Sequence, residues 1–315
     1  MNKTAFLFPG QGAQYAGMGR NLYDHFPEAR QVFESADQAL GFSLSALCFE
    51  GPDEKLQRTE NTQPAILTVS VAAWKVLDAG GIRPQYVAGH SLGEYSALVA
   101  AGALSLEEAV KTVRLRGRYM QEAVPVGQGT MAAVLGLSSA TLEEVCRQAA
   151  QGETVAPANY NSTQQIVIAG HQAAVNRAIA LAKEKGAKRS ILLPVSAPFH
   201  CRLMWPAQER LKQDLCRLMF QVPRCPLVNN VDALPVVSPD GLREGLIRQV
   251  SSAVKWQQTM DFMLSQGIST FIELGPGKVL SGLLKKLTSE VRVLNVEDQS
   301  GVQVALKQWG AKENG

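Results

Sequence analysis

Short apolar runs alternate with amphipathic segments from one end of this 315-residue chain to the other. Residues 5–8 form the first apolar run, which a glycine-rich turn and an amphipathic segment at residues 26–40 follow. Residues 62–79 are typical of a buried helix, and the run at residues 86–88 again precedes a turn and a helical segment. This alternation predicts an α/β protein with a mostly parallel sheet. A chain of this length can form one large domain, or a large domain with a smaller one.

The middle third of the chain has a different order of elements. Strands are expected at residues 130–136, 154–160, 165–169 and 189–193, and helices at residues 139–150 and 171–185. The resulting order β-α-β-β-α-β is that of a ferredoxin-like unit. We therefore predict a small subdomain at residues 124–196, inserted into a core formed by residues 1–123 and 197–315.

Composition and charge exclude several classes of protein. Hydrophobic residues at 46% and charged residues at 19% are the values of an ordinary globular protein. No apolar stretch reaches about 18 residues and the N-terminus lacks a signal-peptide core, so we expect no membrane contact and a cytoplasmic location. The net charge of +3 comes without a basic cluster, so we expect no nucleic-acid partner. Five scattered cysteines without a Cys-x-x-Cys pair indicate a reducing compartment and no metal site.

The pentapeptide Gly89-His90-Ser91-Leu92-Gly93 spells Gly-x-Ser-x-Gly between an apolar strand and a helix of small residues. A serine hydroxyl becomes a nucleophile when a tight turn exposes it and a base accepts its proton. The helix after the turn also directs free N–H groups and its positive end toward the serine. Ser91 is therefore the candidate nucleophile, and a glycine turn with an ordinary serine cap is the structural alternative.

The chain has only four histidines that could act as its base: His25, His90, His171 and His200. His90 adjoins Ser91 at the bend, where neighbouring side chains diverge, so it is a poor base. His25 and His171 are expected at helix starts on the surface. His200 lies in an irregular segment after the last subdomain strand, and such junctions often carry catalytic groups. We therefore pair Ser91 with His200. In lipases and esterases the histidine comes late in the chain, whereas more than a hundred residues follow His200, so a plain α/β-hydrolase is disfavoured.

Apolar residues recur every three or four positions along residues 106–120, which predicts one buried stripe of a helix. Arg116 lies about 60° from the centre of that stripe, at its edge, whereas Arg118 lies on the solvent side. A buried guanidinium needs an anionic partner, and a carboxylate held by two hydrogen bonds matches its geometry. One candidate partner is a structural one, Glu94 or Glu273. The other is an acyl substrate that ends in a carboxylate.

Residues 8–19, with the sequence FPGQGAQYAGMG, form a glycine-rich loop directly after the first expected strand. The loop is not a dinucleotide fingerprint, because Tyr15 stands where Gly-x-Gly-x-x-Gly needs its third glycine, and no Gly-Lys-Ser/Thr follows. A loop at the end of a strand that brings a backbone N–H group to an oxyanion fits better.

Six ordered motifs span nearly the whole chain: Phe8-Pro9-Gly10-Gln11-Gly12, Thr62-Gln63-Pro64-Ala65, Gly89-His90-Ser91-Leu92-Gly93-Glu94, Arg116-Gly117, Pro198-Phe199-His200 and Glu273-Leu274-Gly275-Pro276-Gly277. Together they resemble malonyl-CoA:acyl carrier protein transacylases, the acyltransferases of fatty acid and polyketide synthesis. The resemblance implies an α/β-hydrolase-like core with a mostly parallel sheet and a ferredoxin-like insert. It implies transfer of malonyl from malonyl-CoA to the phosphopantetheine thiol of an acyl carrier protein, with no resident cofactor.

The resemblance also implies a role for each matching residue. Ser91 would attack the thioester while His200 takes its proton. The backbone N–H groups of Gln11 and Leu92 would hold the oxyanion. The main-chain carbonyl of Gln249 would orient the histidine, so no catalytic acid would be needed.

Four further assignments concern the substrate site, and one concerns the assembly. Arg116 would bind the malonyl carboxylate, Gln63 would line the site, and we also assign His90 to substrate binding. Phe199 departs from the fatty-acid-synthesis members, which usually have serine before the histidine. At this position the chain is similar to malonyl-selecting acyltransferases of polyketide synthases, so we expect malonyl to be preferred over methylmalonyl. We expect the protein to act as a monomer. The alternative function is an editing hydrolase of acyl carrier protein thioesters, against which Arg116 argues because it favours a dicarboxylic acyl chain.

Overall fold

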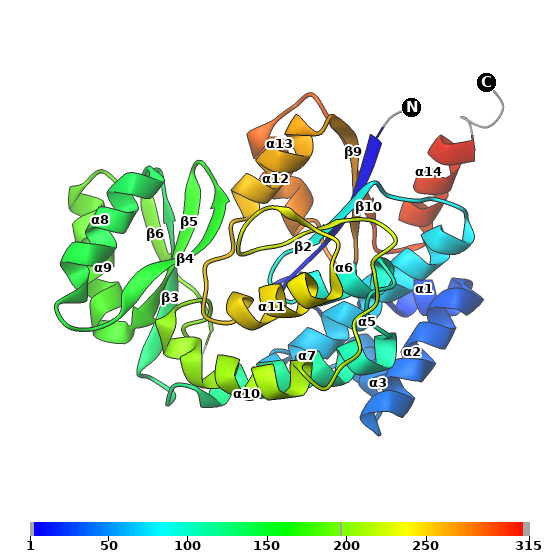
Figure 1. Ribbon diagram of the computed structural model, residues 1–315, viewed down its shortest axis with the longest axis horizontal. Coiled ribbons are helices and arrows are strands. Elements are labelled where there is room, and N and C mark those ends of the chain that lie inside the picture. The colour runs from blue at the N-terminus through cyan, green and yellow to red at the C-terminus, as the bar shows by residue number, and fades with distance from the viewer. Residues whose placement is uncertain (1–2, 196, 311–315) are drawn as a thin grey trace.

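The computed structural model describes residues 3–195 and 197–310, and it contains two separate sheets (Figure 1). The larger sheet has six strands in the order β10-β9-β1-β2-β7-β8. Their bounds are β1 Lys3–Phe8, β2 Tyr86–Gly89, β7 Leu227–Val228, β8 Pro235–Val236, β9 Ile268–Leu274 and β10 Arg292–Val296. All pairs in this sheet are parallel except β7 with β8. The predicted α/β class with a mostly parallel sheet is therefore confirmed.

Helices cover both faces of the larger sheet because alternate residues of its central strand point to opposite sides. In β1, Phe6 and Phe8 pack into the hydrophobic cluster that includes the long helices α5 (Thr59–Ala79) and α7 (Leu106–Glu122). Ala5 and Leu7 pack into the cluster of α12 (Trp256–Ser265) and α13 (Val279–Leu287). The helices of the core are α1 Arg20–His25, α2 Pro27–Leu40, α3 Leu44–Glu50, α4 Asp53–Leu56, α5 Thr59–Ala79, α6 Gly93–Ala100, α7 Leu106–Glu122, α10 Trp205–Leu215, α11 Pro239–Gln249, α12 Trp256–Ser265, α13 Val279–Leu287 and α14 Gln299–Gly310, with a short 3-10 helix at Arg202–Met204.

The expected helices are present with shifted starts. α5 begins at Thr59, three residues before the predicted start, and it is buried along most of its length. Its interior contains Pro64, which sits in the first turns of the helix. The segment predicted as one helix at residues 26–40 begins at Pro27, because Phe26 is extended and separates α1 from α2.

The smaller sheet is antiparallel and has the order β4-β5-β3-β6. Its elements are β3 Gly129–Leu135, α8 Ser139–Ala150, β4 Val155–Ser162, β5 Gln165–His171, α9 Gln172–Glu184 and β6 Arg189–Leu192, which is the predicted β-α-β-β-α-β order. Alternate residues of β3 again divide between two cores: Ala132 and Val134 pack with α8 and α9, and Met131 and Ala133 pack with the main core. The domain boundaries at residues 124 and 196 stay a prediction, and Ser196 lies outside the described residues.

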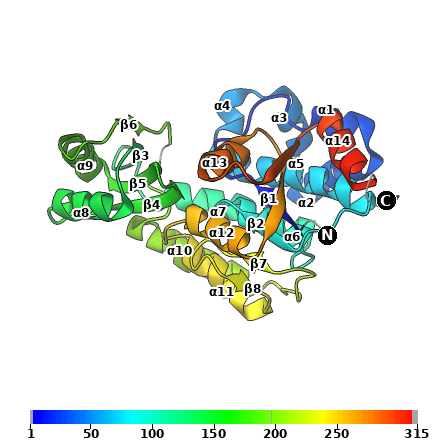
Figure 2. The ribbon, with the colours of Figure 1, turned by 90° about the horizontal axis from the view of Figure 1, so that it is seen from above.

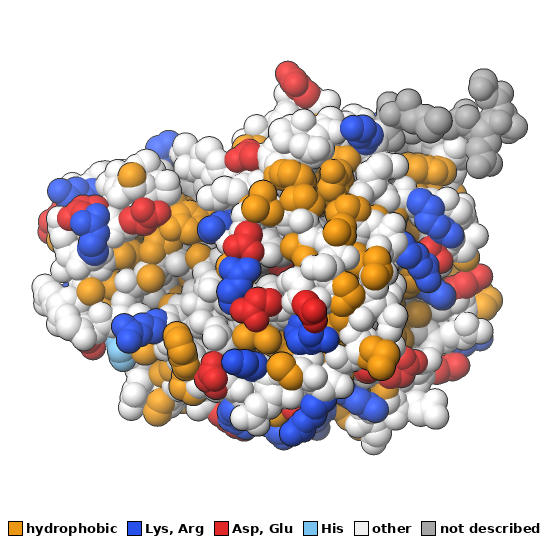
Figure 3. All heavy atoms as spheres, viewed as in Figure 1, with side chains coloured by type: hydrophobic (Ala, Val, Ile, Leu, Met, Phe, Trp, Pro, Cys, Tyr) orange, Lys and Arg blue, Asp and Glu red, His pale blue; other side chains and the backbone are white. Residues whose placement is uncertain are grey.

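Two views agree that the smaller sheet with α8 and α9 lies at one end of the molecule (Figures 1 and 2). The two parts are joined by backbone contacts of β4, since Tyr160 N donates to Val254 O and Val254 N donates to Ala158 O. On the face shown in Figure 3, basic and acidic side chains are interspersed, in keeping with the small net charge of +3. Within the described ranges, no helix combines the length and apolarity that crossing a membrane requires.

Candidate active site

Ser91 stands on the tight turn between β2 and α6, with a left-handed backbone conformation of φ +53°. The flanking glycines let the backbone fold this closely. A Cβ at Gly93 would lie 2.1 Å from the carbonyl oxygen of Phe8, and one at Gly89 would lie 1.9 Å from the carbonyl carbon of Gly93. A non-glycine residue with positive φ is strained, and such strain is concentrated at functional sites. The predicted nucleophile turn is therefore present.

His200 faces Ser91 from the segment between β6 and the 3-10 helix, again with positive φ, at +59°. Its Nε2 lies 2.7 Å from Ser91 Oγ, and its Nδ1 lies 2.9 Å from the main-chain oxygen of Gln249. A carbonyl only accepts, so Nδ1 carries the proton and Nε2 is free to accept the serine proton. Burial, followed by the charge of Arg116, lowers the pKa of His200 to about 3. The imidazole is thus neutral and able to act as a base at neutral pH.

Arg116 reaches the same hydroxyl from α7, and only 1% of the residue is exposed. Its Nη2 donates to Ser91 Oγ at 3.1 Å and to Gln249 Oε1 at 3.0 Å, and its Nη1 donates to Gln63 Oε1 at 2.8 Å. Its guanidinium also lies 5.8 Å from the centre of the Tyr95 ring. The inward direction predicted from helical spacing is therefore confirmed. Among the described residues, no carboxylate lies within 4.0 Å of this guanidinium.

Neither carboxylate proposed as a structural partner of Arg116 forms that ion pair. Glu273 Oε1 and Oε2 accept from the backbone N–H groups at the start of α13, Leu280 N at 3.0 Å and Ser281 N at 2.8 Å. Glu94 is fully buried and its Oε2 accepts from Asn230 N at 2.9 Å. Burial raises the pKa of Glu94 to about 7, and the nearby charge of Arg116 works against that shift. Arg116 therefore keeps its charge without a direct carboxylate partner.

The two backbone N–H groups predicted to bind an oxyanion follow neighbouring strands at the same edge of the sheet. Phe8 at the end of β1 pairs with Gly89 at the end of β2, so the residues that follow each strand leave the sheet side by side. Within the described part of the chain, neither Gln11 N nor Leu92 N donates a hydrogen bond. Free backbone N–H groups are what an oxyanion requires, and Leu92 stands at the start of α6 whereas Gln11 lies in the turn after β1. The assignment of Gln11 and Leu92 stays a prediction.

Comparison with known proteins agrees with this geometry. Residues 5–305 match the family described as acyl transferase domain. The chain belongs to this family. It is 46% identical over 308 residues to the malonyl CoA-acyl carrier protein transacylase of Escherichia coli strain K12, an alignment that covers 98% of this chain and all of that protein.

Solved structures of this acyltransferase family superpose closely on the chain. The malonyl CoA-acyl carrier protein transacylase of Coxiella burnetii has a TM-score of 0.96 at 45% identity, over 98% of each chain. A malonyl-transacylase solved in complex with a type II PKS acyl-carrier protein has a TM-score of 0.95 at 44% identity, over 97% of this chain and 99% of that one. The resemblance drawn from the six sequence motifs is therefore confirmed.

The three further residues assigned to the substrate site of this acyltransferase make different contacts. Gln63 is buried and holds Arg116. Phe199 is 8% exposed and packs in the main core directly before the histidine. His90 instead turns toward the smaller sheet, where its Nε2 lies 2.9 Å from Asn161 Oδ1. Burial lowers the pKa of His90. Substrate binding by these residues stays a prediction.

The sequence reasoning missed Asn230, which holds the nucleophile turn from the loop after β7. Its Oδ1 accepts from Ser91 N at 2.8 Å, and its Nδ2 donates to Gly89 O at 2.7 Å. The signal that could have found it is its position, because loops at the carboxyl ends of parallel strands carry functional groups. The side chain of Gln249 was also missed: its Nε2 donates to Ser91 O at 3.0 Å, so this residue contacts the turn as well as the histidine.

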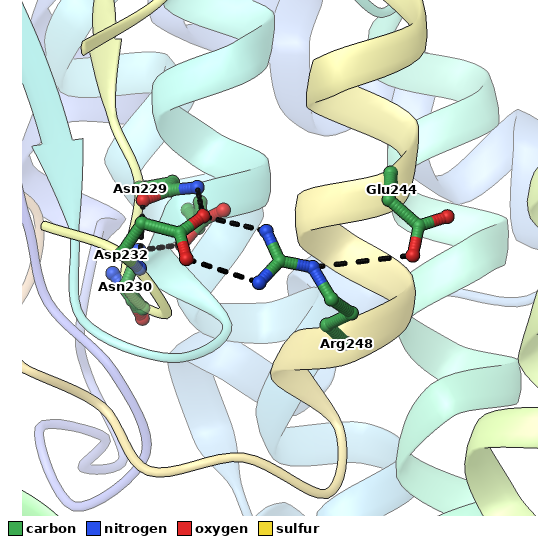
Figure 4. A network of polar contacts seen from close by, with 6 residues as sticks. Asn229, Asn230, Asp232, Glu244 and Arg248 are labelled. Atoms are coloured by element: carbon green, nitrogen blue, oxygen red, sulfur yellow. Dashed lines mark hydrogen bonds and ion pairs between the residues drawn. The ribbon is translucent and has the colours of Figure 1, made fainter. Parts of the chain in front are cut away.

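An ion pair ties the Asn230 loop of the acyltransferase to α11 (Figure 4). Arg248 Nη1 and Nη2 lie 3.0 and 2.5 Å from the two carboxylate oxygens of Asp232. Asn229 Nδ2 donates to the same carboxylate at 2.9 Å. The hydrogen bond from Arg248 is the main cause that lowers the pKa of Asp232 to about 2. Gln249 is the residue after Arg248 on α11. The ion pair therefore fixes the position of the Asn230 loop relative to Gln249, and both residues contact the turn at Ser91.

No group of three or more histidine, cysteine, aspartate or glutamate side chains that could hold a metal ion occurs in residues 3–195 and 197–310. The cysteines Cys48, Cys146, Cys201, Cys216 and Cys225 are all free thiols. The expectation that the enzyme needs no cofactor stays a prediction.

Proposed function

We propose that this acyltransferase moves a malonyl group from malonyl-CoA to the phosphopantetheine thiol of an acyl carrier protein, through a malonyl ester of Ser91. The relatives named above, including one solved with a PKS acyl-carrier protein, support the reaction. The observation that carries the substrate class is the buried guanidinium of Arg116, which lies 3.1 Å from Ser91 Oγ without a direct carboxylate partner among the described residues. The malonyl carboxylate, whose carbon is two bonds from the reacting carbonyl carbon, would supply the missing anion.

In the first half of the reaction, Ser91 Oγ attacks the thioester carbonyl of malonyl-CoA and its proton passes to His200 Nε2. The 2.7 Å contact between these atoms allows direct transfer. The backbone N–H groups of Gln11 and Leu92 stabilise the oxyanion, a contribution typically worth about 10²- to 10³-fold per donor. The C–S bond then breaks, and the leaving CoA thiolate takes the proton from His200. The carbonyl of Gln249 holds Nδ1–H while the imidazolium exists.

In the second half, the thiol of the carrier protein gives its proton to the same Nε2 and attacks the malonyl ester. The C–O bond to Ser91 breaks and Oγ recovers the proton from His200. The two half-reactions are therefore symmetric, and one base with one oxyanion site serves both. No observation favours the editing hydrolase. A monomeric state and a cytoplasmic location stay predictions.

Intact-mass spectrometry tests this proposal directly. The protein is mixed with malonyl-CoA, then with holo acyl carrier protein, and both masses are followed. We expect a single malonyl adduct that disappears as the carrier gains the same mass, and no adduct on the Ser91→Ala variant. Ser96→Ala, on the helix that follows the turn, is the matched control and is expected to form the adduct. An adduct that persists on Ser91→Ala, or that only water removes, would refute the transfer mechanism.

A further inference from the structure

The side-chain amide of Gln249 has one orientation that its surroundings accept. Its Nε2, with two N–H donors, lies within hydrogen-bond distance of three oxygens: Ser91 O at 3.0 Å, Glu94 Oε2 at 3.0 Å and Asn230 Oδ1 at 3.2 Å. Its Oε1 accepts from Arg116 Nη2 at 3.0 Å. An amide turned by 180° would place its oxygen against three acceptors and its NH₂ group against a cation. The direction of this amide is therefore tied to the place of the guanidinium.

Glu94 supplies the strongest of the three acceptors, because it is the only one that can carry a charge. Its Oε2 is shared by Gln249 Nε2 and by the backbone N–H of Asn230 at 2.9 Å, so one oxygen organises both neighbours of the nucleophile turn. Its Oε1 has no hydrogen-bond partner within the described residues. A buried carboxyl oxygen without a hydrogen-bond partner costs stability, so its presence beside the nucleophile turn calls for an explanation.

We propose that Glu94 is a positioning residue that fixes the Gln249 amide with its oxygen toward Arg116, so that the guanidinium is held beside Ser91 Oγ for the carboxylate of the acyl group. This inference rests on the proposed malonyl transfer. The contact survives protonation, because a proton on the free Oε1 leaves Oε2 able to accept both hydrogen bonds. A glutamine at this position can place its own oxygen where Oε2 lies, whereas a methionine of similar size offers no acceptor.

The test measures kcat/KM for acylation of Ser91 with malonyl-CoA and with acetyl-CoA, whose acyl group has no carboxylate. We expect Glu94→Met to lower the malonyl-to-acetyl ratio about tenfold, the effect of one lost hydrogen bond to a charged group, chiefly through a higher KM for malonyl-CoA. Glu94→Gln is expected to restore the ratio to within about threefold of the wild type. Glu273→Met removes a buried carboxylate that does not contact Gln249, and it is expected to change thermal stability without changing the ratio.

Gln249→Met is the second variant, and it keeps the main-chain carbonyl that holds His200. It is expected to lower the ratio as Glu94→Met does, and the double variant is expected to show no further loss. Equal losses toward both substrates, absence of rescue by Glu94→Gln, or an unchanged ratio in Gln249→Met would each overturn the inference. These outcomes differ from failure of the proposed function, in which the wild-type protein itself would form no malonyl adduct.

Discussion

Replacing Arg116 by alanine is expected to remove the preference for malonyl while leaving the nucleophile Ser91 and its base His200 in contact. In the structure the guanidinium is buried, and its hydrogen bonds go to amide and hydroxyl oxygens of Gln63, Gln249 and Ser91. The variant therefore loses the cation without exposing a carboxylate of the protein. The contact between His200 Nε2 and Ser91 Oγ involves no atom of Arg116, so the nucleophile and its base remain.

The size of the effect follows from the bonds that the malonyl carboxylate would make. Each hydrogen bond that involves a charged group contributes about 1.5–3 kcal/mol, and a carboxylate can accept two from one guanidinium. Some of this gain is offset, because Arg116 already donates to three oxygens in the free enzyme. We therefore take the lower end, about 3 kcal/mol, which at about 1.4 kcal/mol per decade is a loss of roughly 150-fold in kcat/KM for malonyl-CoA.

The assay is single-turnover acylation followed by intact-mass spectrometry, with malonyl-CoA and acetyl-CoA measured in parallel. Arg116→Ala is expected to lose malonyl loading and to keep or gain acetyl loading. Arg118→Ala is the matched control, because this arginine lies two residues further on the same helix and is exposed. Malonyl loading by Arg116→Ala within about threefold of the wild type would refute the assignment. Equal losses for both substrates would show that Arg116 supports the fold rather than the carboxylate.

Two further predictions concern the catalytic base His200 and the residue before it in the chain, Phe199. NMR of labelled histidine is expected to show that His200 takes up no proton until the pH falls to about 3. Because the unfolded chain binds this proton near pH 6.5, His200 lowers stability as the pH falls from about 6.5 to 3, and a folded-state titration near pH 6.5 would contradict the structure. Phe199→Ser is expected to raise acylation by methylmalonyl-CoA relative to malonyl-CoA, since a smaller side chain leaves room for the α-methyl group. Comparable rates with the two thioesters in the wild-type protein would already refute the selectivity hypothesis.

Much of the fold was predictable because the pattern of apolar residues along the sequence differs between helices and strands. The alternation of apolar strands with amphipathic helices indicated a parallel sheet, and the change of order in the middle third indicated the second, antiparallel sheet. The start of α2 was predicted less well: Phe26 fits an apolar helical stripe, but its backbone is extended at the boundary set by Pro27. Periodicity reports which face is buried, whereas a helix end depends on backbone angles of single residues.

The candidate site was predictable where local geometry decides it and not where distant segments meet. Ser91 follows from its turn, and the inward direction of Arg116 follows from the helical repeat. The contacts of Asn230 with Ser91 and Gly89 join residues about 140 positions apart, and no periodic pattern encodes them. The salt bridge considered for Arg116 was wrong for a related reason. Glu94 lies close enough to affect the pKa of Arg116, but the amide of Gln249 stands between the two groups.

The guanidinium of Arg116, which we propose to bind the acyl carboxylate, also acts on the base, His200. Ser91 Oγ lies 3.1 Å from Arg116 Nη2 and 2.7 Å from His200 Nε2, so one hydroxyl separates the cation from the imidazole. After burial, the charge of Arg116 is the largest cause that lowers the pKa of His200. A carboxylate bound to Arg116 offsets that charge, which raises the pKa of His200 and makes it a stronger base. An acyl group without a carboxylate leaves the pKa of His200 at its lowered value. We therefore expect discrimination between malonyl and acetyl groups in the chemical step as well as in binding, which is a second reason to expect that Arg116→Ala keeps or gains acetyl loading.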